Sequence, residues 1–587
     1  MNTGGAWTRR RWSELTVAMS EAPLLWADWA RRQLARSSVG LALADQHGWD
    51  VSGEVSHSGE YDAQRLPHER TAAGQFFTPP ALADALVALI VRQGTPGSFL
   101  DPACGAGELL CAVFRWRRAQ GSTVAAALDG LTGWDKDPTA AWGALASLIL
   151  CALDASQGPI PGDIDIRGAV DALTETGAFD AVVMNPPYLE AKRMRKAQPG
   201  LREWLRVAFP ELHGAFDLYM AFLHCSRRWV NDPGAVAALL PNKVCQGRYA
   251  ARFRQGRSLH LTHLVDASRM HPRPFPGTSV YPVLLRLSTV VPSVVTTRHV
   301  FTADDVADSL ETQISPSQYA LFDESPWFAP LPTWSILGRI DTGVRLGDVA
   351  TVRSTCSFHE KGLRERFVVA KRPRGRAYPY IGGTSFTRRS EVHPYALNWD
   401  GWWLRDAQDE LRKLGNPLPE LAGTFGRPKV VFRQHARRVE AWLDAEGRYA
   451  TKDVYPIAWS EKDGWNERLL TAIFNSTVFT ALYNTVFQGI VVGGETYHYL
   501  PTFLRQIPVP ELSQLESVCR ALASPDTRWS HIDQLVCAAY GISEAEREQL
   551  VDIHLRRVGA AVPDGRLVAG VETHGVQKDA LACSPDR

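Results

Sequence analysis

Strand-like and helix-like runs alternate along residues 71–310, and this alternation predicts the fold of that region. The strand-like runs are short and apolar, and longer stretches with apolar residues at helical spacing separate them. They are SFLD, LTGWD, FDAVVMN, AVAALLP and VYPVLLRL. Strands that alternate with helices build a largely parallel sheet covered on both faces, with ligands at the carboxyl ends of the strands. We therefore expect an α/β fold with a doubly wound, Rossmann-like domain.

The pattern changes on both sides of this region. Residues 1–70 are predicted to be a helical N-terminal region, and residues 311–340, with many Pro, Ser and Trp residues, a linker. Residues 341–510 contain short β-prone runs and turns, including a predicted hairpin around Glu446-Gly447. Residues 511–587 are expected to be helical, with a loose tail.

Composition limits the class of protein. The chain has 587 residues, too many for one core, with 45% hydrophobic and 22% charged residues and a net charge of +1. Its nine cysteines show no CxxC pairing, so neither a zinc site nor a disulfide framework is predicted. No apolar run reaches membrane-spanning length, and no secretory signal is evident. We expect a cytoplasmic monomer without a membrane segment or a metal.

A basic run lies in the β-prone region. Residues 361–389 contain nine Lys or Arg against one acid, a pattern that attracts phosphates. Tyr378, Tyr380 and Phe386 are interleaved with it, which favours a binding face over the alternative, a solvated loop. The candidate DNA-binding residues are Lys371, Arg372, Arg374, Arg376, Arg388, Arg389 and Arg433.

The tetrapeptide Asn185-Pro186-Pro187-Tyr188 follows the apolar run 181–184 and carries the candidate chemistry. The prolines remove backbone donors and restrict the residues before them, so the loop is stiff and presents its carbonyls. The Asn185 side-chain oxygen and the Pro186 carbonyl suit the two N–H bonds of a planar exocyclic amine, and Tyr188 suits its ring. Taken alone, the tetrapeptide is also compatible with a turn that has no chemistry.

A glycine-rich turn upstream predicts a nucleotide site. The strand SFL leads into DPACGAGE and then into a helical run, and the glycines let the backbone approach a ligand closely. The next strand ends at GWDKDP, where Asp135 is the expected acceptor for ribose hydroxyls, while Asp137 is expected to start the next helix. Because the chain has no GxGxxG and no Walker lysine, NAD and ATP fit less well than a sulfonium nucleoside.

In this order the motifs resemble those of adenine-N6 DNA methyltransferases of the TaqI type. The likeness also includes GQFFTPP at 74–80, DLYMAFL at 217–223, ALLPN at 238–242 and FPG at 275–277, and it continues more weakly to residue 510. The resemblance implies S-adenosyl-L-methionine as cofactor and methyl transfer to N6 of a flipped-out adenine in double-stranded DNA. It further implies a catalytic domain over 71–310, target recognition by 341–510, and a cognate restriction endonuclease in the same restriction-modification system. A site such as GTCGAC, or another sequence containing TCGA, is expected.

The resemblance also implies roles for single residues. Catalytic roles are expected for Asn185, Pro186, Tyr188 and Phe275, although Phe275 on its own is equally consistent with core burial. Asp163 and Asp165 are rivals of Asp171 for the acid near the cofactor adenine. The expected cofactor-binding residues are Thr78, Asp101, Ala103, Gly105, Gly107, Asp135, Asp171 and Phe222.

Other classes of protein are less well supported. A protein-glutamine N5-methyltransferase also uses an NPPY loop but needs no large basic C-terminal domain. A non-catalytic DNA specificity subunit needs neither the cofactor turn nor NPPY, and a fused endonuclease needs a further nuclease domain. Cys104 lies in the cofactor turn, so we expect a small buried residue and not the nucleophile of a cytosine methyltransferase. Glu108 is expected to start a helix and not to act as a base.

Overall fold

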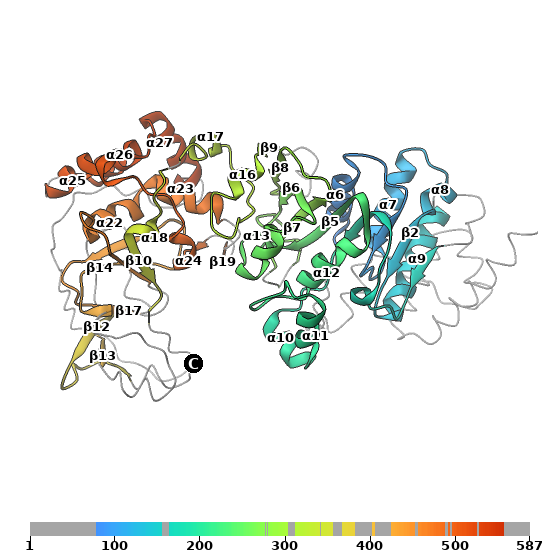
Figure 1. Ribbon diagram of the computed structural model, residues 1–587, viewed down its shortest axis with the longest axis horizontal. Coiled ribbons are helices and arrows are strands. Elements are labelled where there is room, and N and C mark those ends of the chain that lie inside the picture. The colour runs from blue at the N-terminus through green and yellow to red at the C-terminus, as the bar shows by residue number, and fades with distance from the viewer. Residues whose placement is uncertain are drawn as a thin grey trace, which may run out of the picture. The chain divides into compact units, whose positions relative to one another are not determined.

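The computed structural model divides the chain into two compact units, residues 1–330 and 331–587 (Figure 1). The predicted helical region 1–70 and the predicted loose tail lie outside the described residues. Those described are 78–154, 164–275, 278, 280–302, 311–340, 342–355, 367–381, 402–405, 424–451, 456–487, 491–492, 496–524 and 527–556.

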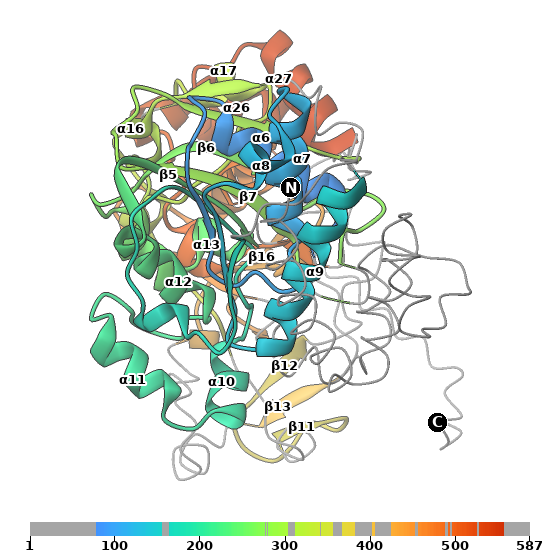
Figure 2. The same ribbon diagram turned by 90° about the vertical axis from the view of Figure 1, so that its right-hand side faces the viewer.

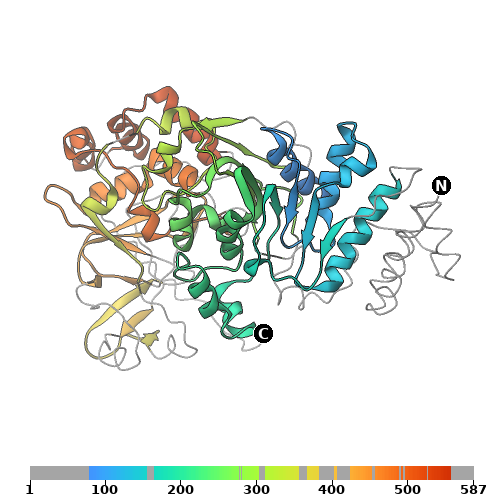
Figure 3. The same ribbon diagram turned by 45° about the vertical axis from the view of Figure 1, so that its right-hand side comes forward.

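Within its described residues the first unit is built on a nine-stranded sheet of order β3-β2-β1-β4-β5-β7-β6-β8-β9 (Figure 3). The strands from β3 to β5 in this order run parallel, whereas β7 is antiparallel to both β5 and β6. Because β1 lies between β2 and β4, the strand order reverses there, and ligands bind at such a switch point. The strands are β1 (Phe99–Asp101), β2 (Leu131–Trp134), β3 (Asp165–Arg167), β4 (Phe179–Met184), β5 (Val230–Pro241), β6 (His260–Asp266), β7 (Pro282–Ser288), β8 (Val295–His299) and β9 (Thr312–Ile314).

Helices connect these strands, and the predicted doubly wound α/β class is confirmed. Figure 2 shows α10 and α11, which follow β4, standing out from the rest of the first unit. The helices are α6 (Pro80–Val91), α7 (Glu108–Ala119), α8 (Val124–Leu128), α9 (Pro138–Asp154), α10 (Ala191–Ala197), α11 (Leu201–Ala208), α12 (Tyr219–Cys225), α13 (Lys243–Gln246), α14 (Ala251–Arg254) and α16 (Pro316–Tyr319).

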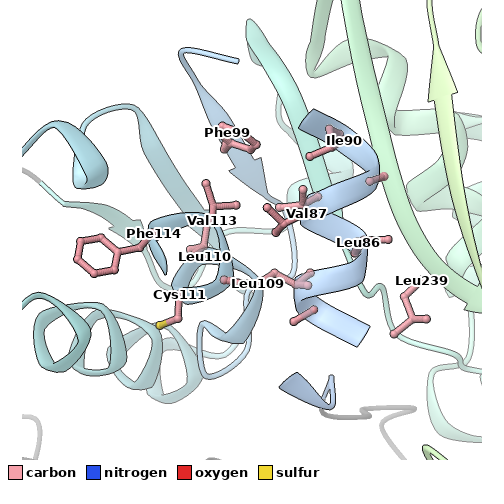
Figure 4. Packing of buried hydrophobic residues seen from close by; sticks show 14 of the residues in the cluster. Leu86, Val87, Ile90, Phe99, Leu109, Leu110, Cys111, Val113, Phe114 and Leu239 are labelled. Carbon is pink, nitrogen blue, oxygen red and sulfur yellow. The ribbon is translucent and has the colours of Figure 1, made fainter. Parts of the chain in front are cut away.

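Apolar side chains of α6 and α7 pack together and against the sheet (Figure 4). Leu86 on α6, Leu110 on α7 and Phe99 on β1 are all fully buried in this cluster. The helix α7 begins directly after Gly107, whose φ is +86°. A Cβ at Gly107 would lie 2.8 Å from the Cα of Ala144 on α9, so a side chain there would push the two helices apart.

The five strand-like runs of the sequence correspond to β1, β2, β4, β5 and β7. The sequence pattern did not reveal β3, an edge strand of three residues of which none is fully buried, so it shows no apolar run. Glu108 is the first residue of α7 and Asp137 directly precedes α9, as predicted.

The segment 311–340 differs from the predicted linker. Its first part belongs to the first unit, because β9 pairs with β8 and the division falls after Pro330. Trp327 and Phe328 are buried, and the Tyr319 hydroxyl donates to the Phe328 carbonyl at 3.1 Å. The Pro- and Ser-rich composition concealed these aromatic core contacts.

In its described residues the second unit has three small sheets and a set of helices, in agreement with the predicted β-rich region followed by helices. The sheets have the orders β10-β18-β14-β16, β11-β13-β12-β17 and β15-β20-β19. The strands are β10 (Ala350–Arg353), β11 (Val368–Val369), β12 (Ala377–Ile381), β13 (Trp403–Arg405), β14 (Lys429–Phe432), β15 (His435–Ala436), β16 (Ala441–Asp444), β17 (Ala450–Thr451), β18 (Ile457–Ser460), β19 (Val491–Val492) and β20 (Thr496–His498). The helices are α17 (Trp334–Leu337), α18 (Leu346–Val349), α22 (Glu467–Asn475), α23 (Thr477–Val486), α24 (Pro501–Leu504), α25 (Glu516–Ala523), α26 (Trp529–Ala539) and α27 (Glu544–Val551).

No single helix in the described part of the chain is long and apolar enough to cross a membrane. The bent pair α22 and α23 meets that test only when the two helices are taken together, by length and composition.

The hairpin predicted around Glu446-Gly447 is wrong. The strands on either side of this turn belong to different sheets, because β16 pairs with β14 whereas β17 pairs in parallel with β12. The Asp444 carboxylate accepts hydrogen bonds from the backbone amides of Arg448 and Tyr449, at 3.0 and 2.9 Å. These bonds shape a turn that leads the chain from one sheet to the next, a geometry that the turn residues alone do not specify.

A buried ion pair stabilises this turn. The Lys429 ammonium contacts the Asp444 carboxylate, and the two side chains are 0% and 2% exposed. The ammonium also donates to the Phe425 carbonyl at 2.9 Å. Burial lowers the pKa of Lys429, and the charge of Asp444 opposes that shift. Each buried charge therefore depends on the other.

We expect Lys429→Met to lower the free energy of unfolding by about 3–5 kcal/mol, because it leaves the Asp444 carboxylate buried without its cation. Thermal and denaturant unfolding of the full chain would measure this loss. The control is Glu446→Gln in the same turn, whose side chain is 63% exposed and should change the stability by less than about 0.5 kcal/mol. Equal stabilities of the two variants would contradict the structural role of the pair.

Candidate active site

A cavity of about 370 Å³ lies at the carboxyl ends of the central parallel strands of the first unit. Its volume is within the range of pockets that hold small molecules and cofactors. The lining includes eight of the residues that the sequence predicted for the site, which come from segments far apart in the chain. They are Thr78, Asp101, Ala103, Gly105, Asp135, Asp171, Asn185 and Phe222.

Four other predicted residues do not line this cavity: Gly107, Pro186, Tyr188 and Phe275. Alternate residues of the NPPY loop (185–188), Asn185 and Pro187, line the cavity, as expected for an extended segment whose side chains point to opposite sides. Phe275 is 6% exposed and belongs to the apolar core. The catalytic roles of Pro186, Tyr188 and Phe275 and the cofactor-binding role of Gly107 stay predictions.

The glycine turn is held in place by Asp135. One carboxylate oxygen accepts a hydrogen bond from the Gly105 amide at 2.9 Å, and the other accepts one from the Asp137 amide at 2.8 Å. The Cys104 amide donates to the Trp134 carbonyl at 2.9 Å, which fixes the turn to the end of β2. The carboxylate therefore organises both loops that border the cavity.

Asp101 lines the cavity at the end of β1 and is 1% exposed. Its carboxyl accepts one hydrogen bond from the Ala103 amide, at 3.2 Å. Burial raises the pKa of Asp101 to about 8, and the negative charge of Asp135 adds to the shift. A positively charged group in the cavity would favour the ionised carboxylate, so this corner of the cavity suits a cation.

The three acids considered for the cofactor adenine differ in position. Asp171 lines the cavity, and its carboxylate pairs with Lys136 at 3.0 Å. Asp165 does not line the cavity, and its carboxylate pairs with Arg167 at 2.7 Å. Asp163 lies outside the described residues. Of the two described, Asp171 is therefore the acid placed to meet a ligand.

The Asn185 amide is held from two sides. Its nitrogen donates to the Thr78 hydroxyl at 3.0 Å, and its oxygen accepts from the Tyr188 hydroxyl at 2.5 Å. The Tyr188 hydroxyl also lies 2.8 Å from the Leu239 carbonyl. These contacts hold the amide with its nitrogen towards Thr78 and its oxygen towards Tyr188.

Tyr188 is 7% exposed, and its ring meets the ring of Tyr219 edge-on, with centroids 6.2 Å apart. Cys104 is a small buried residue, as predicted, and burial keeps the pKa of its thiol far above the ordinary range. That thiol is therefore neutral and poorly suited to be a nucleophile.

The candidate DNA-binding residues fall into three groups. Lys371, Arg372, Arg374 and Arg376 are exposed, whereas Arg388 and Arg389 lie outside the described residues. Arg433 is partly buried and pairs with Glu440 at 2.8 Å.

The prediction that aromatic residues interleaved with the basic run form a binding face is wrong for Tyr378 and Tyr380. Tyr378 and Tyr380 are 6% and 1% exposed and belong to the core of the second unit, because β12 alternates its side chains between core and surface. Phe386 lies outside the described residues. Tyr378 and Tyr380 therefore do not form the binding face that the sequence pattern indicated.

The sequence analysis missed several residues that line the cavity. Leu189, Gln198, Leu201 and Leu218 come from the loop and helices that follow β4. They have no individual chemical signature, and only their position shortly after NPPY could have pointed to them.

Two family models match parts of this chain. The Eco57I restriction-modification methylase model matches residues 158–269, and the TaqI-like C-terminal specificity domain model matches residues 386–509. The modification methylase CviBIII of Paramecium bursaria Chlorella virus NC1A is 25% identical over 189 residues. This match covers 32% of the present chain and 42% of that protein.

The solved structures that match this chain include a restriction-modification enzyme and a restriction endonuclease. The Type IIL restriction-modification enzyme MmeI, solved in complex with DNA, matches with a TM-score of 0.50 and 12% identity, over 79% of this chain and 73% of that one. The type IIG restriction endonuclease BpuSI matches with a TM-score of 0.40 and 14% identity, over 85% and 67% of the two chains.

The methylase matches imply S-adenosyl-L-methionine as the cofactor, and the cavity fits it. Its cationic sulfonium and ammonium groups suit a pocket bordered by the carboxyl groups of Asp101 and Asp135, and its adenine suits the apolar wall that includes Phe222. The chain is therefore similar, in two consecutive segments, to a restriction-modification methylase and to a TaqI-like specificity domain.

Proposed function

We propose that this protein transfers a methyl group from S-adenosyl-L-methionine to N6 of adenine in double-stranded DNA. One observation carries the proposal: the Asn185 amide lines the same cavity as Asp101 and Asp135. The acceptor that an exocyclic amine needs and the carboxyl groups that a cationic cofactor needs therefore border one space. The specificity-domain match supports DNA as the substrate over a protein glutamine.

The reaction needs an activated amine. The lone pair of an adenine amine is delocalised into the ring, and hydrogen bonds to two fixed acceptors localise it on nitrogen. Asn185 Oδ1 supplies one acceptor, and the Pro186 carbonyl is proposed as the other. The cofactor supplies an electrophilic methyl group. Catalysis by this chain is then positioning and electrostatics without a covalent intermediate.

The contacts of the Asn185 amide support this role. An amide oxygen has two lone pairs, so Oδ1 can accept from the Tyr188 hydroxyl and from the substrate amine together. Thr78 holds the amide nitrogen and keeps that donor away from the substrate. The target base cannot be reached inside a duplex, so it must flip out. Tyr188 and Phe275 are proposed to contact its ring.

The finer assignments belong to this proposal as well. We infer a recognition site that contains TCGA, such as GTCGAC, and a cognate endonuclease that the methylation restrains. Cytoplasmic location and a monomeric state are proposed with it. Sequencing host DNA for N6-methyladenine, with and without the gene, would test both which base is methylated and which recognition sequence contains it.

Asn185→Ala should lower kcat by about 10²–10³-fold, because the amine loses one fixed acceptor. Cofactor affinity should remain near the wild-type value, since Asp101 and Asp135 are unchanged. Methyl incorporation into DNA and calorimetric cofactor binding measure the two quantities. The matched variant Asn185→Asp keeps an acceptor and should retain more activity than the alanine variant. Near-normal turnover of Asn185→Ala would refute the assigned role.

The variants Tyr188→Phe and Tyr188→Ala separate the hydroxyl from the ring. The phenylalanine variant loses the bonds to Asn185 and Leu239, so kcat should fall about tenfold while the ring remains. The alanine variant should lose more, because base–aromatic stacking contributes about 1–3 kcal/mol. A duplex with a weakly paired target base should restore part of the activity of Tyr188→Ala only. Identical losses in the two variants would exclude a stacking role for the ring.

Cofactor affinity should depend on pH through Asp101. Its pKa of about 8 means that the carboxyl is largely protonated at pH 7, so binding a cation beside it must release a proton. Affinity should therefore rise with pH up to about 8 and then level off. Calorimetry in buffers of different ionisation enthalpy counts the proton released. Asp101→Asn serves as the control, because it retains only the titration of the cofactor's own amino group.

Proton release that is equal in the wild-type protein and in Asp101→Asn would show that Asp101 does not face the cation.

A further inference from the structure

A basic helical arm follows the NPPY loop. We define the arm as α10, α11 and their connecting turn, residues 191–208, and Figure 2 shows both helices standing out from the first unit. The arm contains six Lys or Arg and one acid, Glu203, in a chain whose net charge is only +1. None of the motifs that indicate the proposed function lies within it.

Three of the four cations of α10 lie on one side of the helix. At about 100° per residue, Lys192, Arg195 and Lys196 cover an arc of about 100°, and Met194 points to the opposite side. Met194 is fully buried, whereas the three cations are exposed. The helix is therefore anchored by an apolar side chain and presents positive charge to the solvent.

The chain segments on either side of the arm meet beside the NPPY loop. The Leu218 amide donates to the Leu189 carbonyl at 2.9 Å, and the Ala191 amide donates to the Asp217 carboxyl at 3.2 Å. Leu189 and Leu218 line the cavity, and so do Gln198 and Leu201 at the turn between the helices. The arm therefore forms part of the cavity wall. Its charged residues Lys192, Arg195 and Lys196 follow Asn185 closely in the sequence.

The second helix adds an apolar surface. Trp204 and Val207 are 41% and 81% exposed, and they lie three residues apart, on neighbouring positions of α11. A surface with cations beside apolar side chains fits a nucleic acid strand, because the cations can bind phosphates and the apolar side chains can contact sugars and bases. The sign of the charge excludes a basic partner surface.

We propose that the arm binds the DNA backbone next to the target base, with Lys192, Arg195 and Lys196 on phosphates. This inference rests on the proposed function, because it assumes DNA as substrate. It assigns a second phosphate-binding surface, on the catalytic unit itself, in addition to the basic run of the second unit. The arm holds the strand at the mouth of the cavity, while base reading is left to the specificity domain.

The test is the triple variant K192Q/R195Q/K196Q. Loss of three phosphate contacts should weaken DNA binding about tenfold or more at about 0.1 M salt and reduce the slope of log affinity against log salt by about 2–3. Circular dichroism and calorimetric cofactor binding should match the wild type, since the three side chains are exposed. The charge-preserving variant K192R/R195K/K196R should bind DNA almost normally.

Neutral methylphosphonate groups, which replace charged phosphates in the DNA, would show which phosphates the arm contacts. Replacing single phosphates beside the target adenine should weaken DNA binding by the wild-type protein. The same replacement should not further weaken DNA binding by the triple glutamine variant, which already lacks the contacts to these phosphates. The matched control K371Q/R372Q/R374Q removes the same number of charges from the second unit and should keep the wild-type sensitivity at these phosphates.

Wild-type salt dependence and wild-type methylphosphonate sensitivity in the triple glutamine variant would overturn the inference. So would a loss of methylation without any loss of DNA affinity, because the arm would then act on the fold of the cavity or on a protein partner. Absence of DNA methylation by the wild-type protein would instead refute the proposed function.

Discussion

The Asp135 carboxylate is the interaction on which the site depends. The glycines of the turn have no side chains to hold its shape, so contacts from outside the turn help to fix its backbone. Asp135 does this by accepting hydrogen bonds from the amides of Gly105 and Asp137. The turn after β1 and the loop after β2 are thereby held together, and the cavity exists because both loops keep their position. The parallel order of β2, β1 and β4 then places Asn185 at the same edge of the sheet.

The sequence predicted most of what is local. Runs such as FDAVVMN predict buried strands because apolar residues are continuous there, and β4 coincides with that run. Strand β3 was missed because an edge strand of three half-exposed residues has no such pattern. The exchange of sheets after β16 was missed for a different reason. The residues around Gly447 define a turn, but strand pairing depends on distant partners such as β12 and β14.

For the candidate site, too, the sequence predicted local features but not contacts between distant segments. Motif order was sufficient to find eight of the residues that line the cavity, from Thr78 to Phe222. It was not sufficient to show which groups hold them, because the bonds of Asn185 to Thr78 and Tyr188 join segments far apart in the chain. Nor did it reveal that Tyr378 and Tyr380 are core residues, since a basic run with aromatics gives no information on which side of a strand each residue lies.

The segment that contains the arm leaves and rejoins the rest of the first unit at neighbouring points, Leu189 and Leu218. A segment closed in this way at its base is an insertion in the architectural sense, because the strands beneath it do not depend on its length. Related chains could lengthen, shorten or recharge this segment while the sheet and the cofactor turn stay unchanged. If the arm binds DNA as proposed, its exposed charges could diverge in evolution separately from the chemistry in the cavity, whereas Gln198 and Leu201, which line the cavity, could not.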